Sequence, residues 1–145
     1  MSFTELLPLR TSGFSDIVDI TAEAARAVAR SGVRDGLLTV FCRGSTGAVT
    51  TIEYEPGVVS DLKRAIENMA PSDIPYEHDR RWGDGNGFAH VRAALMKPSL
   101  TVPVVDGSLT LGTWQQIVFI DFDNRPRERE LVLHVLGESP PGEAV

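Results

Sequence analysis

Residues 99–136 read SLTVPVVDGSLTLGTWQQIVFIDFDNRPRERELVLHVL, and this stretch decides the fold class. Apolar and polar residues alternate through it in short runs, which is the pattern of half-buried strands. Strands are predicted at residues 99–105, 109–111, 116–122 and 129–136. Asp106-Gly107 predicts a tight hairpin turn, and residues 123–126 predict another turn. The C-terminal half is therefore expected to be a meander of strands.

The N-terminal half mixes helices with strands. Residues 15–20 are strand-like, Thr21 is expected to cap a helix, and Gly32 is expected to end it. Further strands are predicted at residues 37–42 and 48–54, and further helices at residues 58–69 and 88–96. The partial segregation of the two kinds of element predicts an α+β fold with a mixed, largely antiparallel sheet. We expect a single domain over residues 1–145, with a frayed tail at 138–145.

Composition narrows the classes of partner. The formal net charge of −6 and the lack of a long basic patch argue against nucleic acid. No apolar run approaches the roughly 18 residues of a membrane span, and we see no signal peptide, so a cytoplasmic location is expected. The single cysteine, Cys42, lies in an apolar run and is expected to be a buried, inert thiol.

A glycine-rich loop holds the candidate chemistry. Residues 72–87 are long and polar, and a loop of this length in a compact domain is often functional. The glycines allow the loop to fold back, so His78 and His90, twelve positions apart, could meet in space. Free backbone N–H groups at the start of the following helix could bind an anion. The alternative is a pair of solvated, idle histidines. His134 lies in an alternating run and is expected to be a strand residue with a local partner.

Other polar residues are candidates from their setting. Ser45 and Thr46 lie in a glycine-flanked turn that could bind an anion, and Arg92 could supply a counter-charge. Glu53 interrupts an apolar, threonine-rich strand, and Gln115 follows an odd polar break between strands. For each of these residues the alternative is an ordinary surface or packing role.

Taken together, these segments resemble the YjbQ-like family, whose members are often described as secondary thiamine-phosphate synthases. The resemblance covers about residues 15–138, and its most specific part is DGNG, a following His, VP, and the LGTWQ turn. It implies a sheet curled into a half-barrel, a homotrimer, and a polar pocket that binds a phosphate-bearing small molecule. It places catalytic residues at His78, His90 and Glu53, with the two histidines as ligands of a divalent metal, Zn²⁺ or Mg²⁺. The proposed substrate or anion contacts, from the resemblance and the turns together, are Ser45, Thr46, Asp84, Gly85, Asn86, Gly87, Arg92, Thr113, Trp114 and Gln115.

Two departures from the family pattern bear on function. Many relatives have histidine where this chain has Gly44 and Phe88, so a histidine-rich metal site is harder to build here. The resemblance implies a transferase that joins a pyrimidine pyrophosphate to a thiazole phosphate. The alternatives are a non-catalytic homotrimer that binds a small molecule or anion, and a hydrolase of a phosphorylated metabolite.

Overall fold

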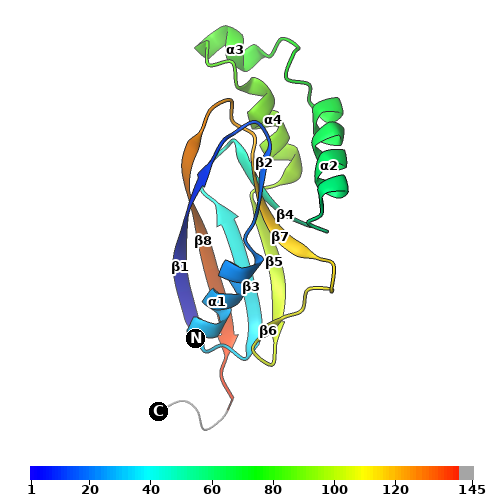
Figure 1. Ribbon diagram of the computed structural model, residues 1–145. Helices are drawn as coiled ribbons and strands as arrows, with labels where there is room; N and C mark the ends of the chain where they lie inside the picture. Colours follow the sequence, from blue (N-terminus) through cyan, green and yellow to red (C-terminus); the bar gives the residue numbers. More distant parts are fainter. Residues whose placement is uncertain (141–145) are drawn as a thin grey trace.

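A computed structural model describes residues 1–140 of the chain as eight strands and four helices (Figure 1). In chain order they are β1 (Ser2–Thr11), β2 (Asp16–Asp19), α1 (Thr21–Ser31), β3 (Asp35–Cys42), β4 (Gly47–Ile52), α2 (Pro56–Met69), α3 (Glu77–Trp82), α4 (Gly87–Met96), β5 (Ser99–Val105), β6 (Ser108–Leu109), β7 (Gln116–Asp121) and β8 (Arg127–Glu138). The α+β class is confirmed.

The strands form two sheets, and every strand pairing is antiparallel. Sheet A has the order β1-β8-β3-β5-β6, and sheet B has the order β2-β7-β4. The β5–β6 hairpin is as expected, and Asp106 and Gly107 take φ values of 51° and 78° in its turn. The rest of the expected meander is wrong, because β7 lies in sheet B while β6 and β8 lie in sheet A.

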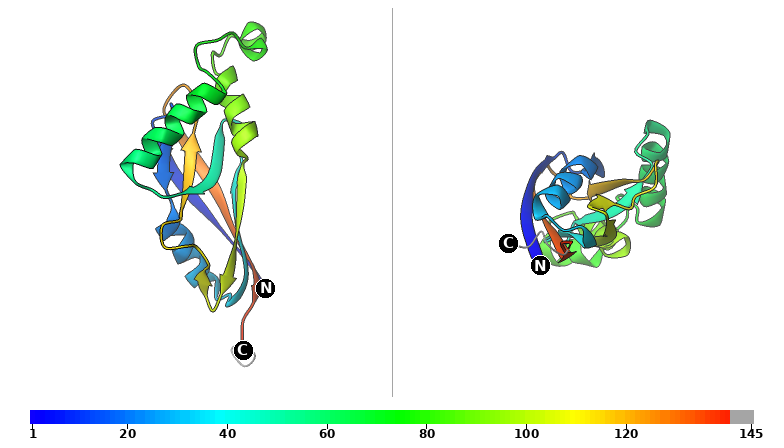
Figure 2. Two further views of the ribbon diagram at one scale, coloured as in Figure 1. Left: turned by 90° about the vertical axis from the view of Figure 1, so that its right-hand side faces the viewer. Right: turned by 90° about the horizontal axis from the view of Figure 1, so that it is seen from below.

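Strand β7 separates two apolar cores. Ile117 and Phe119 pack in the first core, which fills the space between the two sheets and α1. Val118 and Ile120 pack in the second core, between sheet B and helices α2 and α4. Sheet A curls around α1, and α2 and α4 lie on the far side of sheet B (Figure 2). This double burial explains why β7 reads as a continuous apolar run.

The structure adds a strand at the start of the chain and corrects two predictions that concern the helices. Residues 2–11 carried no prediction, yet they form β1 at the edge of sheet A. Helix α3 occupies part of the predicted loop. Thr21 does not cap α1: Ile20 stands at the cap, and the Thr21 hydroxyl accepts a hydrogen bond from the Ile117 amide at 2.9 Å.

The end of the chain departs from its prediction in part. Glu138, expected in the frayed tail, is the last residue of β8. Residues 141–145 of that tail lie outside the described residues. Gly32 does end α1, in the left-handed region at φ 72°.

Candidate functional site

The junction of α3 and α4 brings His78 and His90 together. Their ring centroids lie 4.5 Å apart, with the rings tilted by 40°. Asp79 fixes the junction, because its Oδ1 accepts a hydrogen bond from the Gly87 amide at 2.9 Å and lies 3.3 Å from His78 Nδ1. Both the His78 and the Asp79 side chains remain partly exposed. The expected meeting of the two histidines is therefore confirmed.

Gly87 permits this close approach of the two helices. A Cβ atom built at Gly87 would lie 2.6 Å from Cβ of Tyr76, which stands at the start of α3. Gly87 is needed because a side chain would not fit here. Its backbone conformation does not require glycine, since its φ is outside the left-handed region.

We expect Gly87→Ala to lower the free energy of unfolding by about 1–3 kcal/mol, since the added methyl group overpacks the junction. Urea denaturation followed by circular dichroism measures this loss. Gly112→Ala is the matched control, because its Cβ would approach no atom closer than 3.8 Å. Equal stability of the two variants would show that the α3–α4 contact is loose.

An open pocket of about 350 Å³ adjoins His90. It lies between α4 and the turn that joins β3 to β4 and is lined by Gly44, Ser45, Gly47, His90, Ala93, Ala94 and Pro98. Ser45 and His90 thus line the same pocket, and a role for Ser45 in anion binding stays a prediction. Thr46 is buried instead, and its hydroxyl group accepts from Arg129 at 2.6 Å and donates to Asp123 at 3.2 Å.

A buried ionic network lies beneath this turn. Asp121 is fully buried, and both of its oxygens accept hydrogen bonds from Arg129 at 2.8 Å. Thr11 donates a further bond to Asp121 at 2.6 Å. Asp123, 1% exposed, accepts from Arg127 at 2.6 Å. Burial opposes ionisation of the two acids, but their hydrogen bonds and the arginine charges outweigh it and lower the pKa of both.

The glycine-rich segment at residues 83–87 is hydrogen-bonded to this network and to the residue that follows it. Asn86 Nδ2 donates to Asp123 at 3.2 Å, and Asn124 donates to the backbone oxygen of Asp84 at 3.0 Å. Gly85 takes a φ of 71°, a conformation that favours glycine. Asn86 Oδ1 is buried and accepts no hydrogen bond within residues 1–140. The loop is thus fixed to the β7–β8 connection through both its backbone and its side chains.

Arg92 lies on the other side of α4 from His90, because residues two positions apart on a helix differ by about 200° in direction. It is 3% exposed and donates to the Ala70 carbonyl at 2.9 Å, to Ser15 at 3.2 Å and to Glu67 at 2.5 Å. Its guanidinium group also stacks on Phe88 at 4.8 Å. These partners tie α4 to α2 and to the β1–β2 turn, and Arg92 does not line the His90 pocket.

The remaining predicted site residues lie at the opposite end of β4. Gly47 pairs with Asp121 and Ile52 with Gln116, so Glu53 follows the far end of the strand. Six strand residues span about 20 Å, so one chain does not bring Glu53 to the histidine pair. Glu53, Thr113 and Trp114 line a separate pocket of about 350 Å³.

The turn at this far end is braced by Gln115. Its side-chain amide donates to Thr51 at 3.1 Å and accepts from the Gly112 amide at 3.1 Å. Trp114 beside it is 72% exposed. The predicted site residues therefore form two groups, one at each end of sheet B.

The histidine pair is an incomplete metal site by itself. Among residues 1–140, no three His, Cys, Asp or Glu side chains are placed to hold one metal ion. Phe88, where the family resemblance implies histidine, is 6% exposed and packs in the second core. A metal on His78 and His90 stays a prediction.

Two further predictions concern side chains outside the two site groups. His134 has its expected local partner, since its Nδ1 lies 2.8 Å from the Thr4 hydroxyl oxygen. Cys42 is buried as expected, and burial raises the pKa of its thiol.

No described helix is both long enough and apolar enough to cross a bilayer. The cytoplasmic location stays a prediction.

Comparison with known proteins identifies the family of this chain. The family described as "UPF0047 protein YjbQ-like" matches residues 5–138. The chain belongs to the YjbQ-like UPF0047 family. A UPF0047 protein of Methanothermobacter thermautotrophicus is 41% identical over 136 residues, which is 94% of this chain and 93% of that protein. One from Archaeoglobus fulgidus is 39% identical over 90% of this chain and 98% of its own length.

Solved structures of the YjbQ-like family share the fold. A YbjQ-like protein of Sulfolobus solfataricus, described as of unknown function, aligns with a TM-score of 0.86 at 28% identity over 95% of this chain and 100% of its own. A member of the family from Clostridium acetobutylicum aligns with a TM-score of 0.83 at 34% identity over 91% and 99%. The half-barrel predicted from the family resemblance is therefore confirmed.

Proposed function

We propose that this YjbQ-like protein is an enzyme that acts on a phosphate-bearing small molecule at the His78–His90 pair. The observation that carries the proposal is the 4.5 Å separation of the two rings beside an open pocket. Histidine exchanges protons near neutral pH and is the commonest metal ligand, so two adjacent imidazoles suit proton transfer to a leaving group.

The specific reaction that we propose is the one implied by the family resemblance, a thiamine-phosphate synthase-like transfer. The thiazole nitrogen forms a bond to the methylene carbon of the pyrimidine pyrophosphate, and the carbon–oxygen bond to pyrophosphate breaks. Pyrophosphate leaves with the bonding electrons, so the barrier falls when its developing charge is neutralised. His78 or His90 would donate a proton to it.

A divalent ion, Zn²⁺ or Mg²⁺, would assist by neutralising the same charge. The two histidines would supply two of its ligands, and a second copy of the chain would supply more. A homotrimer is part of this proposal, and the outer face of sheet A supports it. That face leaves Leu6, Leu37, Phe41 and Leu136 between 41% and 54% exposed on adjacent strands. Assembly would also let Glu53 and Trp114 of one copy approach the histidines of another.

A non-catalytic binding protein is the second candidate. Gly44 and Phe88, in place of two family histidines, favour it because they remove potential metal ligands from the site. Hydrolysis of a phosphorylated metabolite, with water in place of the thiazole, would use the same residues as the transferase.

The test is incubation of the purified protein with both phosphorylated substrates, with product and released phosphate measured separately. Thiamine phosphate with pyrophosphate supports the transferase. Phosphate release without the condensed product indicates hydrolysis instead. Ligand retained through gel filtration without turnover refutes the enzyme and supports the binding protein. Metal analysis of the same preparation, with its mass in solution, tests the ion and the trimer.

A further inference from the structure

A notch opens where β3 ends beside β8. The two strands pair up to Cys42 and Leu131, whereas β1 pairs with β8 as far as Arg127. Residues 127–130 of β8 therefore have β1 on one side and no strand on the other in the described chain. The notch is a pocket of about 400 Å³ lined by Cys42, Arg43, Gly44, Arg127, Glu128, Arg129 and Glu130. From the arginine N–H groups that face it, we infer that this notch is a binding site for a phosphoryl group.

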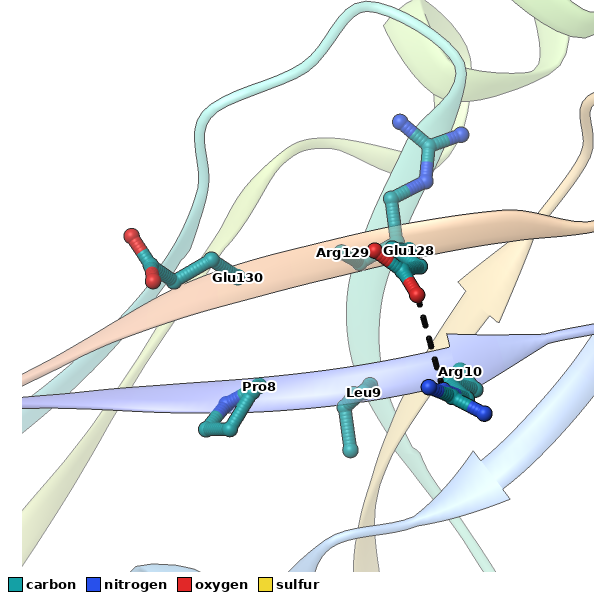
Figure 3. A pocket seen from close by; sticks show the side chains of 6 residues that line it. All are labelled: Pro8, Leu9, Arg10, Glu128, Arg129 and Glu130. Atoms are coloured by element: carbon teal, nitrogen blue, oxygen red, sulfur yellow. Dashed lines mark ion pairs between the residues drawn. The ribbon is translucent and has the colours of Figure 1, made fainter.

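Arg129 presents a fixed donor to the notch. Its side chain is only 8% exposed, and its Nε and Nη2 are held by Asp121 and Thr46. Nη1 donates no hydrogen bond within residues 1–140, and it faces Gly44. Figure 3 shows the Arg129 guanidinium extending away from β1. Because the rest of the group is already immobilised, binding an anion at Nη1 costs little further side-chain entropy.

Gly44 keeps that donor open. A Cβ atom at residue 44 would lie 2.9 Å from Nη1 of Arg129 and would cover it. Gly44 also lines the pocket that contains His90, so the notch and that pocket adjoin. A substrate with its phosphate in the notch could place its reacting end at the histidines. This bridging rests on the proposed function, whereas phosphate binding in the notch does not.

Two further arginines complete the site. Arg127 is 32% exposed and uses only Nη1, on Asp123, so its other N–H groups are available within the described chain. Arg43 is bound to Glu130 in an ion pair whose side chains are 56% and 46% exposed, and such pairs are weak. Glu128 turns instead toward Arg10 on β1, as Figure 3 shows, at 3.5 Å.

This donor set fits the several oxygens of a phosphate ester or pyrophosphate. Guanidinium groups bind such oxyanions through paired, charge-assisted hydrogen bonds. Three arginines from the β3–β4 turn and from β8 approach one notch, with Asp121 and Asp123 neutralising two of them from beneath. The ligand class is thus a small molecule with at least one terminal phosphoryl group.

The test is calorimetric titration of the full chain with pyrophosphate, and with inorganic phosphate, at low ionic strength. We expect Arg127→Gln to weaken pyrophosphate binding roughly ten- to hundredfold, the range for lost hydrogen bonds to a charged group. Gly44→Ala should weaken it by about tenfold or more without removing any charge, since the methyl group covers the Arg129 donor. Arg64→Gln is the matched control, because Arg64 is 69% exposed on α2, pairs with Asp61 and does not line the notch, and it should keep the wild-type affinity.

Three outcomes would overturn the inference. The first is no pyrophosphate binding by the wild-type chain at millimolar concentration. The second is an equal loss in Arg64→Gln and Arg127→Gln, which would indicate a general charge effect. The third is loss of binding in His90→Ala with binding kept in Arg127→Gln, which would move the phosphate to the histidines and leave the proposed function intact. If Arg127→Gln fails to fold, Gly44→Ala and Arg127→Lys give the same comparison. Turnover lost in His90→Ala with phosphate binding kept would support the notch and the proposed function separately.

Discussion

Replacement of Arg129 by methionine is expected to lower the free energy of unfolding by about 3–5 kcal/mol, because removing one partner of a buried pair leaves an uncompensated charge. Asp121 has no exposed surface and would lose both hydrogen bonds from the guanidinium group. Thr46 would lose its donor at 2.6 Å as well. The remaining bonds, from Thr11 and from the Asp123 amide at 3.0 Å, cannot replace a charge.

The loss should depend on pH with a definite sign. Hydrogen bonds from Arg129 and Thr11 outweigh the burial of Asp121 and lower its pKa in the folded wild type. That carboxylate therefore contributes stability above its unfolded pKa, near 4, and the contribution is lost as the pH falls through the lowered folded pKa. In Arg129→Met, burial of Asp121 is opposed by the hydrogen bonds from Thr11 and the Asp123 amide but no longer by the guanidinium group, so the acid is protonated more readily. The difference between wild type and variant should be largest near neutral pH and should narrow on acidification.

Urea denaturation of both proteins at several pH values measures this difference. Arg10→Met is the control, because it breaks an exposed ion pair and should change stability by less than about 1 kcal/mol. Arg129→Lys keeps a charge without the two-pronged contact and should fall between methionine and wild type. Equal losses in Arg10→Met and Arg129→Met, or a gap that widens in acid, would contradict the role given to the network.

The sequence shows most elements of this fold but not how the two sheets divide them. Alternation and the Asp106-Gly107 turn predict the β5–β6 hairpin, because both signals are local. The assignment of β7 and β8 to different sheets depends on packing between distant segments, which a local pattern does not record. β1 escaped prediction because Leu6 and Leu7 break the alternation and Pro8 argues against a strand, although an edge strand tolerates proline.

The same distinction applies to the site. His78 and His90 could be paired in advance because one glycine-rich loop joins them. Asp121 and Arg129 are predicted only as strand residues and not as partners, although acids follow the apolar run of β7 and arginines begin β8. Their contact joins the two sheets, so no spacing rule for a single strand or hairpin predicts it. The sequence likewise does not predict that the candidate site residues lie in two groups at opposite ends of sheet B, because the resemblance gives residue identities without distances.

Alanine at His90 is expected to reduce turnover of the phosphate-bearing substrate by about 10²–10⁴-fold, the usual contribution of a general acid or base. His78→Ala should produce a loss of similar size, because the two rings are in contact and are proposed to act together. If they do act as a unit, the double variant should lose no more than the worse single variant. Steady-state kinetics on the four proteins, with metal content measured alongside, checks this.

His134→Gln is the matched control, since it removes the third histidine and keeps a hydrogen-bonding group for Thr4. Its turnover and metal content should equal those of the wild type. Losses in His78→Ala and His90→Ala that multiply in the double variant would instead assign the rings independent roles. Full turnover in either single variant would remove that ring from the chemistry, and in both it would move the reaction to the Glu53 and Trp114 end of sheet B. If the two rings share a role in catalysis, their losses of turnover should not add in the double variant. If the rings only pack against each other, a folded variant should keep its turnover.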